Sequence, residues 1–102
     1  MAFYTDNFLL KRRRWWLNNI HKVQAFVDSS WYTGEIQKKE LQGDKIVLNV
    51  VFSELAPMSC TITSVRILDV DGETAAQKSE SIIKAAGQGV LLKFELPITE
   101  EV

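Results

Sequence analysis

The clearest pattern in this chain is the alternation of apolar and polar residues in its last third. Every second residue of the segment 90–98 is apolar and would share one face: Val90, Leu92, Phe94, Leu96 and Ile98. Lys93 and Glu95 fall on the opposite face. This period of two predicts a half-buried β-strand, and residues 62–70 show a second one.

Three more segments carry strand patterns. Residues 20–27 alternate, turn-forming residues follow at 28–30, and residues 31–36 are rich in β-formers, which predicts a first hairpin. Residues 46–52 follow a Gln42-Gly43-Asp44 turn signal and are apolar on both faces, so they should form a central strand.

The dipeptide Asp71-Gly72 predicts a tight hairpin, because both residues tolerate a positive φ. Residues 74–86 contain helix formers, but the tight turn before them favours a strand over 74–81. Pro97 has no N–H to donate and fits a strand end or an edge strand. We therefore predict a mainly β protein, a small antiparallel β-sandwich (immunoglobulin-like) of about six to seven strands, with a small barrel as the other arrangement.

The N-terminal segment breaks this pattern. Thr5 or Asp6 could cap a short helix that runs to about Leu17, with the four cations of Lys11-Arg12-Arg13-Arg14 in its C-terminal half, where the helix dipole favours them. Its apolar stripe is incomplete, because Arg13 falls within it. We expect one chain of two parts, a helix or basic aromatic arm over 1–20 and the β-sandwich over 21–102.

Charge is uneven along the 102 residues. The net charge is −1, yet residues 1–24 carry five basic side chains against Asp6 alone, a charge of +4. The candidate binding residues of this segment combine cations with aromatic rings: Lys11, Arg12, Arg13, Arg14, Trp15 and Trp16. A docked helix or subunit contact, a nucleic-acid surface and an anionic membrane surface all remain open for them.

Two further aromatic residues, Trp31 and Tyr32, are candidate anchors for a partner or stacking platforms for a carbohydrate. They could equally lie in the core. The sequence does not separate these alternatives.

Residues for reaction chemistry are sparse. The single cysteine, Cys60, cannot form an intramolecular disulfide, and with the single histidine, His21, it cannot form a structural zinc site. The carboxylates of Asp69, Asp71 and Glu73 lack the rest of a calcium-binding loop, so solvated turn residues are expected. We predict no catalytic residue, metal or cofactor, and hence no enzyme.

No apolar run reaches the length of a membrane span, and the basic run follows the short apolar segment 8–10 instead of preceding a longer one. We therefore expect synthesis in the cytoplasm without a transmembrane segment.

The order of these segments is itself a pattern. It runs from Asn19-Ile20-His21-Lys22-Val23 to Trp31-Tyr32, through the apolar strand ending at Phe52 and the segment 62–69 with Asp71-Gly72, to residues 88–94. In this order the chain resembles a family of small proteins encoded in prophages of Firmicutes near tail-fibre genes. The resemblance implies a tail or baseplate accessory protein that is located in the virion, and it brings no site residues.

Two functions are therefore expected as alternatives. The first is a non-enzymatic structural or interaction module that binds other phage structural proteins or itself. The second is a nucleic-acid or anionic-surface binder that uses the basic aromatic segment, a run that has no place in the family pattern.

Overall fold

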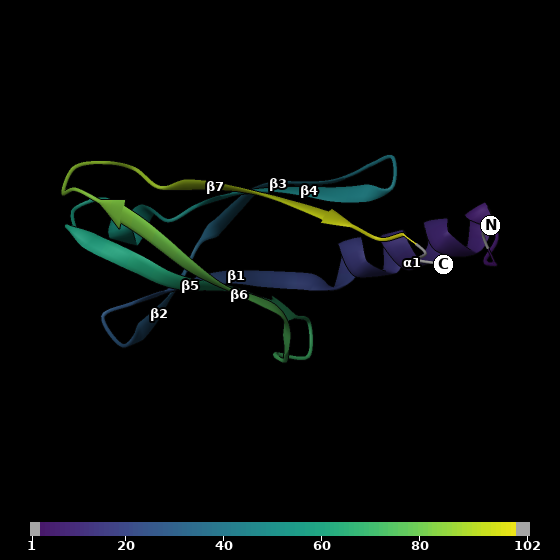
Figure 1. The fold of residues 1–102 in the computed structure, drawn as a ribbon, viewed down its shortest axis with the longest axis horizontal. Helices are drawn as coiled ribbons and strands as arrows, with labels where there is room; N and C mark the ends of the chain where they lie inside the picture. Colours follow the sequence, from purple (N-terminus) through teal and green to yellow (C-terminus); the bar gives the residue numbers. More distant parts are fainter. Residues whose placement is uncertain (1–2, 100–102) are drawn as a thin grey trace.

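The computed structural model describes residues 3–99 as one α-helix, one 3-10 turn and seven strands (Figure 1). In chain order they are α1 (Asp6–Asn19), β1 (Ile20–Val27), β2 (Ser30–Thr33), β3 (Glu35–Gln42), β4 (Lys45–Val51), η1 (Ser53–Leu55), β5 (Cys60–Asp69), β6 (Thr74–Lys84) and β7 (Leu91–Pro97). The molecule is elongated, with extents of 48 × 25 × 23 Å, and α1 lies at one end of its long axis (Figure 1).

The strands form two antiparallel sheets that lie one over the other. One sheet has the order β2-β1-β5-β6 and the other the order β3-β4-β7. The smaller immunoglobulin-like sandwiches also divide seven strands into sheets of four and three. The prediction of a mainly β antiparallel sandwich with an N-terminal helix or arm is confirmed, and this segment is a helix.

The core lies between the inner strands of the two sheets. Their buried, inward side chains include Val23, Ala25 and Val27 from β1, Ile46, Leu48 and Val50 from β4, and Ile62, Val65 and Ile67 from β5. Burying each of the larger aliphatic side chains contributes about 1.5–3 kcal/mol. The predicted central position of the apolar strand is confirmed, since β4 pairs with β3 on one side and β7 on the other.

Two shifts of strand register keep the apolar side chains of β5 and β1 in the core. Buried positions in β5 step by three residues from Ile62 to Val65, where the pairing with β6 shifts register. The same step occurs in β1 from Ile20 to Val23, beside a register shift against β5. A bulge of this kind adds one residue and restores the inward phase of the strand.

The prediction of one continuous strand over residues 31–36 is corrected by a change of sheet at Gly34. The chain leaves β2 there and enters β3 in the facing sheet, while the Gly34 N–H donates to the carbonyl oxygen of Val23 over 2.9 Å. A Cβ atom at this position would lie 2.5 Å from Cγ1 of Val50 and 2.9 Å from Cε1 of Phe52. Only glycine lets the crossing segment pack this closely on the core.

The hairpin after β5 exists, but its turn is longer than predicted. Gly72 has a φ of 83° and its N–H donates to the Asp69 carbonyl oxygen, while Asp71 does not have a positive φ. Asp69 Oδ1 accepts from the N–H groups of Asp71 and Glu73, each over 3.0 Å. This carboxylate therefore stabilises the turn. The strand that follows confirms the prediction over 74–81 and continues to Lys84.

A buried lysine closes the end of the sandwich away from the helix. Lys84 is 4% exposed, and its Nζ donates to the carbonyl oxygens of Ala56 (3.2 Å), Ala85 (2.9 Å) and Met58. These bonds hold the segment after η1 against the end of β6. The sequence does not indicate this role, because a lysine among polar strand residues carries no signal of burial.

The last strand has the predicted faces but is less buried than expected. Val90 is 7% exposed, whereas Leu92, Phe94 and Leu96 point inward and are only half-buried. The reason is position, because β7 is an edge strand of the three-stranded sheet. The edge position inferred from Pro97 is therefore confirmed.

Replacing Gly34 by alanine should destabilise the protein by about 1–3 kcal/mol, because the added methyl group overpacks against Val50 and Phe52. Urea unfolding followed by circular dichroism measures this free energy. Gly89→Ala is the matched control, since nothing lies within 4 Å of a Cβ there and its cost should stay within about 0.5 kcal/mol. Equal stability of the two variants would contradict the close approach at Gly34.

Candidate functional site

The helix that carries the basic run is capped at its start. Thr5 is extended, and its Oγ1 accepts from the N–H of Phe8 over 3.2 Å. The helix continues to Asn19, two residues beyond the predicted end, and β1 follows without a loop. Lys11 to Arg14 therefore lie in mid-helix, and the last turn holds no basic residue. The prediction that the helix dipole favours these cations is wrong.

The helix has a packed side and an outward side. At 100° per residue, the half-buried positions before the last residue of the helix cluster on one side: Leu9, Leu10, Arg13, Trp16 and Leu17. The exposed positions occupy the other: Phe8, Lys11, Arg12, Arg14 and Trp15. No residue of α1 is fully buried, so this one-sided contact is weak for a helix of 14 residues.

Two of the six candidate residues of this segment contact the sandwich. Arg13 Nε donates to the carbonyl oxygen of Ile98 over 2.9 Å, which ties the helix to the residue after β7. Trp16 packs against the core cluster beside Leu17. Both side chains position α1, which leaves Lys11, Arg12, Arg14 and Trp15 to face solvent.

Aromatic rings and a cation form a row along the outward side, which we call the aromatic ridge: Tyr4, Phe8, Arg12 and Trp15. The rings of Tyr4 and Phe8 stack with centroids 4.8 Å apart, and the Arg12 guanidinium lies 5.6 Å from the Phe8 ring centre. Phe8 is 40% exposed and Trp15 is 56% exposed. The cation stiffens the ridge by a cation–π contact that is worth about 0.5–1 kcal/mol at such a site.

The outward cations keep their charge available. Within residues 3–99, no ion pair involves Lys11, Arg12 or Arg14, and Asp6 is the one acidic residue of the helix. The outward side of α1 is therefore positively charged as well as aromatic.

A groove of about 670 Å³ separates the helix from the ends of the sheets. Arg12, Trp15 and Trp16 line its helix side. Asp69 at the end of β5 and Glu95 on β7 are among the residues that line its other side. Arg12 and Trp15 of the aromatic ridge therefore border an open groove whose lining also includes Asp69 and Glu95.

Trp31 and Tyr32 lie on opposite faces of β2. Tyr32 packs against the core, so it is not available as a platform. Trp31 lies on the outer face, 4.9 Å from the Phe26 ring centroid, with the Arg66 guanidinium 3.9 Å above its own ring centre. Arg66 is itself held by Gln24, whose Oε1 accepts from Nε over 2.8 Å. One face of the Trp31 ring is thus occupied by an arginine.

The side chains that could act as a nucleophile or a base, Cys60 and His21, lie far apart in the structure. His21 lies at the start of β1 next to the Asp69 end of β5, while Cys60 begins β5 at the other end of the sheet. In the described part of the chain, no group of three or more His, Cys, Asp or Glu side chains is arranged to hold a metal ion. The outward side of α1 is therefore the candidate site.

Comparison with family models, with curated proteins and with solved structures finds no match to this chain. Within residues 3–99, the one α-helix is too short and too polar to cross a membrane.

Removing the Arg13 side chain should cost about 1–2 kcal/mol of folding free energy, because the Ile98 carbonyl loses its charged donor. Arg14→Ala serves as the control, since Arg14 is exposed on the same helix and its removal should change stability by less than about 0.5 kcal/mol. Thermal and urea unfolding of the two variants measure the difference. Indistinguishable unfolding curves would mean that Arg13 does not anchor the helix.

Proposed function

We propose that this protein is a non-enzymatic interaction module that docks on another protein through the outward side of α1, as an accessory of a prophage tail or baseplate. The aromatic ridge is the observation that supports the proposal. Phe8 and Trp15 expose 40% and 56% of their surface beside Arg12. Aromatic and arginine side chains are enriched at protein interfaces, where a few of them supply most of the binding energy.

The weak attachment of the helix supports the same proposal. A helix of 14 residues without a buried side chain draws little stability from its own protein. A partner that covers Phe8 and Trp15 would add the burial that the sandwich does not provide. The tail or baseplate setting comes from the resemblance of the strand segments to prophage proteins, since the fold is a scaffold for many functions.

Replacing Trp15 by alanine should weaken binding to the cognate tail protein at least tenfold, because an exposed ring that anchors an interface is worth about 2 kcal/mol or more. The candidate partners are the purified products of the neighbouring tail genes, and isothermal titration calorimetry measures the affinity. Ile83→Ala is the matched control, because Ile83 is 82% exposed on β6 outside the helix. Circular dichroism should show both variants folded.

Two results would count against the proposal. One is the absence of binding between the wild-type protein and every structural protein encoded beside it. The other is equal loss of affinity in the Trp15 and Ile83 variants, which would place the interface elsewhere.

The second candidate is a nucleic-acid or anionic-surface binder, and the unpaired cations favour it. Lys11, Arg12 and Arg14 have no ion pair within the described residues, and Trp15 lies between them for stacking on a base. Arg13 is engaged with Ile98, so the run can offer three phosphate contacts from its four cations.

This count sets the salt dependence that the second candidate must show. Three phosphate contacts predict a slope of about −2.7 when the logarithm of the affinity for double-stranded DNA is plotted against that of the salt concentration. Fluorescence anisotropy with single- and double-stranded oligonucleotides measures it. The Arg14→Ala variant should lower the slope by about one unit, and no binding at low salt removes this candidate.

A further inference from the structure

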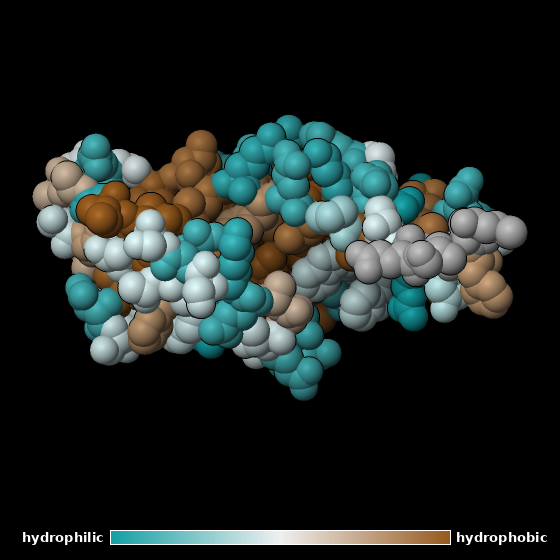
Figure 2. Space-filling model, viewed as in Figure 1, coloured by the Kyte–Doolittle hydropathy of each residue, from teal (hydrophilic) through white to brown (hydrophobic). Residues whose placement is uncertain are grey.

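The sandwich is open along one side, between β6 and β7. A groove of about 300 Å³ runs there, and its apolar floor comes from both sheets: Val65, Ile67, Ala76, Ile82, Leu92, Phe94 and Leu96. In Figure 2 apolar side chains are visible in the hollow between the two sheets. The groove exists because the four-stranded sheet faces one of only three strands, so that nothing lies beyond β7 in its own sheet.

Of the four edge strands of the two sheets, β7 is the one that is both long and paired without a register shift. The strand β2 is short, at four residues, and the pairings of β3 and β6 each contain register shifts. The pairing of β7 with β4 runs from Leu91 to Pro97 without a shift. Natural proteins blunt edge strands by shortness or bulges, because a long regular edge pairs with other chains.

Two hydrogen bonds show which backbone groups of β7 face away from β4. The Phe52 N–H donates to the Val90 carbonyl oxygen, and the Ile98 N–H donates to that of Asp44. In an antiparallel ladder this bonding alternates, so even-numbered residues of β7 bond to β4. The N–H and C=O groups of Leu91, Lys93 and Glu95 therefore point to the free edge, together with the carbonyl of Pro97.

We propose that the free edge of β7 pairs antiparallel with β7 of a second copy of this chain, about a two-fold axis at Phe94. The sequence of β7 supports this register on both faces. On the outer face it places Lys93 of each copy opposite Glu95 of the other, which gives two such pairs. It also places Leu91 of each copy opposite Pro97 of the other. On the inner face it places Phe94 opposite its counterpart and Leu92 opposite Leu96 of the second copy.

Among the symmetric registers, the axis at Phe94 is the one that places Lys93 opposite Glu95, whereas an axis at either charged neighbour opposes like charges. Shifting the axis to Lys93 would place two lysines directly opposite each other, and shifting it to Glu95 would do the same with two carboxylates. Like charges in directly opposite positions are destabilising, whereas opposite charges contribute about 0.2–1 kcal/mol for each pair. The axis at Phe94 gives two attractive pairs and no repulsive one.

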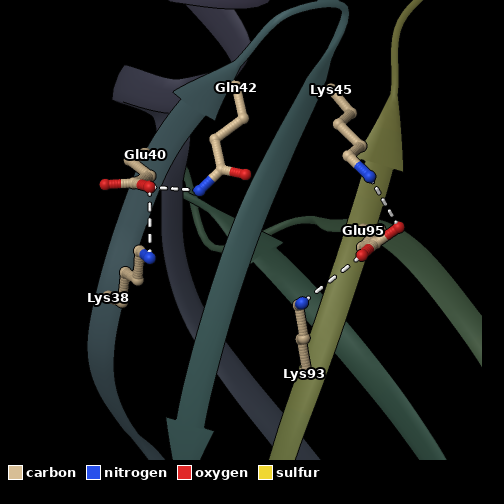
Figure 3. Close-up of polar contacts among 6 residues, drawn as sticks. All are labelled: Lys38, Glu40, Gln42, Lys45, Lys93 and Glu95. Carbon is tan, nitrogen blue, oxygen red and sulfur yellow. Dashed lines mark hydrogen bonds and ion pairs between the residues drawn. The ribbon is translucent and has the colours of Figure 1, made fainter.

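The charged groups are already in place for this pairing. Figure 3 shows Lys93 and Glu95 on the outer face of β7, where Glu95 contacts Lys45 at 2.9 Å and Lys93 at 3.5 Å. The hydrogen bond and charge of Lys45, with Lys93 beside it, lower the pKa of the Glu95 carboxyl below its ordinary value. This carboxyl is therefore ionised at neutral pH.

The pairing also accounts for apolar surface that the single chain leaves exposed. Leu91 is 65% exposed, and Pro97 would cover it from the second copy. Half-buried Phe94 would meet its counterpart at a position without backbone hydrogen bonds, where opposite side chains of an antiparallel pair are closest. The two open grooves would then close on each other. This inference depends on β7 and not on the helix, so it holds whether or not α1 docks on a partner.

A charge-reversal experiment tests the register. Sedimentation velocity at micromolar concentrations should show the wild-type chain as a dimer. Lys93→Glu and Glu95→Lys should each be monomeric, because each places like charges opposite, with self-affinity lowered at least tenfold. An equal mixture of the two variants should form a heterodimer, since its opposite pairs are again attractive. Recovery in the mixture also proves that both variants are folded.

The control is Lys38→Glu, which makes the same charge change on the edge strand β3 of the same sheet. It should remain a dimer. A monomeric wild-type protein, single variants that still dimerise, or a mixture that stays monomeric would each overturn the proposal. Dimerisation that is lost in Trp15→Ala instead would assign the contact to the helix.

A cross-link tests the position of the axis. In a Cys60→Ser background, Phe94→Cys should form a disulfide-linked dimer under mild oxidation, because the opposite Cα atoms would be about 4.5 Å apart. Leu92→Cys should stay unlinked, since its counterpart would be roughly 13 Å away along the strands. The opposite result in non-reducing electrophoresis would rule out the register centred on Phe94.

Discussion

The burial of one face of β4 against β1 and β5 is the contact on which the rest of this structure depends. Ile46, Leu48 and Val50 provide that face, and the core cluster joins them to the inward side chains of both strands opposite. The chain must change sheets without opening this contact. Gly34 allows the first change by packing its backbone onto Val50 and Phe52, and Lys84 secures the end of the sandwich by donating to three carbonyl groups.

A core concentrated on the inner strands leaves the periphery of the molecule incompletely covered. The helix is held by half-buried side chains and by the bond from Arg13 to Ile98, while its aromatic ridge faces solvent. On the long side, β7 covers β6 only in part, which opens the groove over Phe94. The two grooves adjoin, because Ala76, Glu95 and Leu96 line both of them. The outward side of the helix and the free edge of β7 are the two regions at which we propose association.

Local sequence was sufficient where a physical signal is local. Alternation in 90–98 predicted the inward residues of β7, and the apolar run 46–52 predicted a central strand. Both predictions succeed because a strand face that is buried must carry apolar residues at every position on that face. A helix cap at Thr5 or Asp6 and the strand over 74–81 followed from capping and turn chemistry. The candidate site was located only in part, since Arg13 and Trp16 belong to the same run as the outward cations but face the sandwich.

The sequence by itself determined the mainly β class and the sides of most strands, because propensity and periodicity act within a few residues. It left the N-terminal segment as either a helix or an arm. Only the tertiary structure decided how deeply each side was buried. Phe94 carries the pattern of a core residue and is half-buried, since depth depends on whether another strand follows β7 in its sheet. It also decided that Tyr32 lies inside and Trp31 outside, that Gly34 divides a predicted strand, and that Lys84 finds its partners 26 and 28 residues away. These outcomes rest on contacts between segments distant in the chain, which no local pattern encodes.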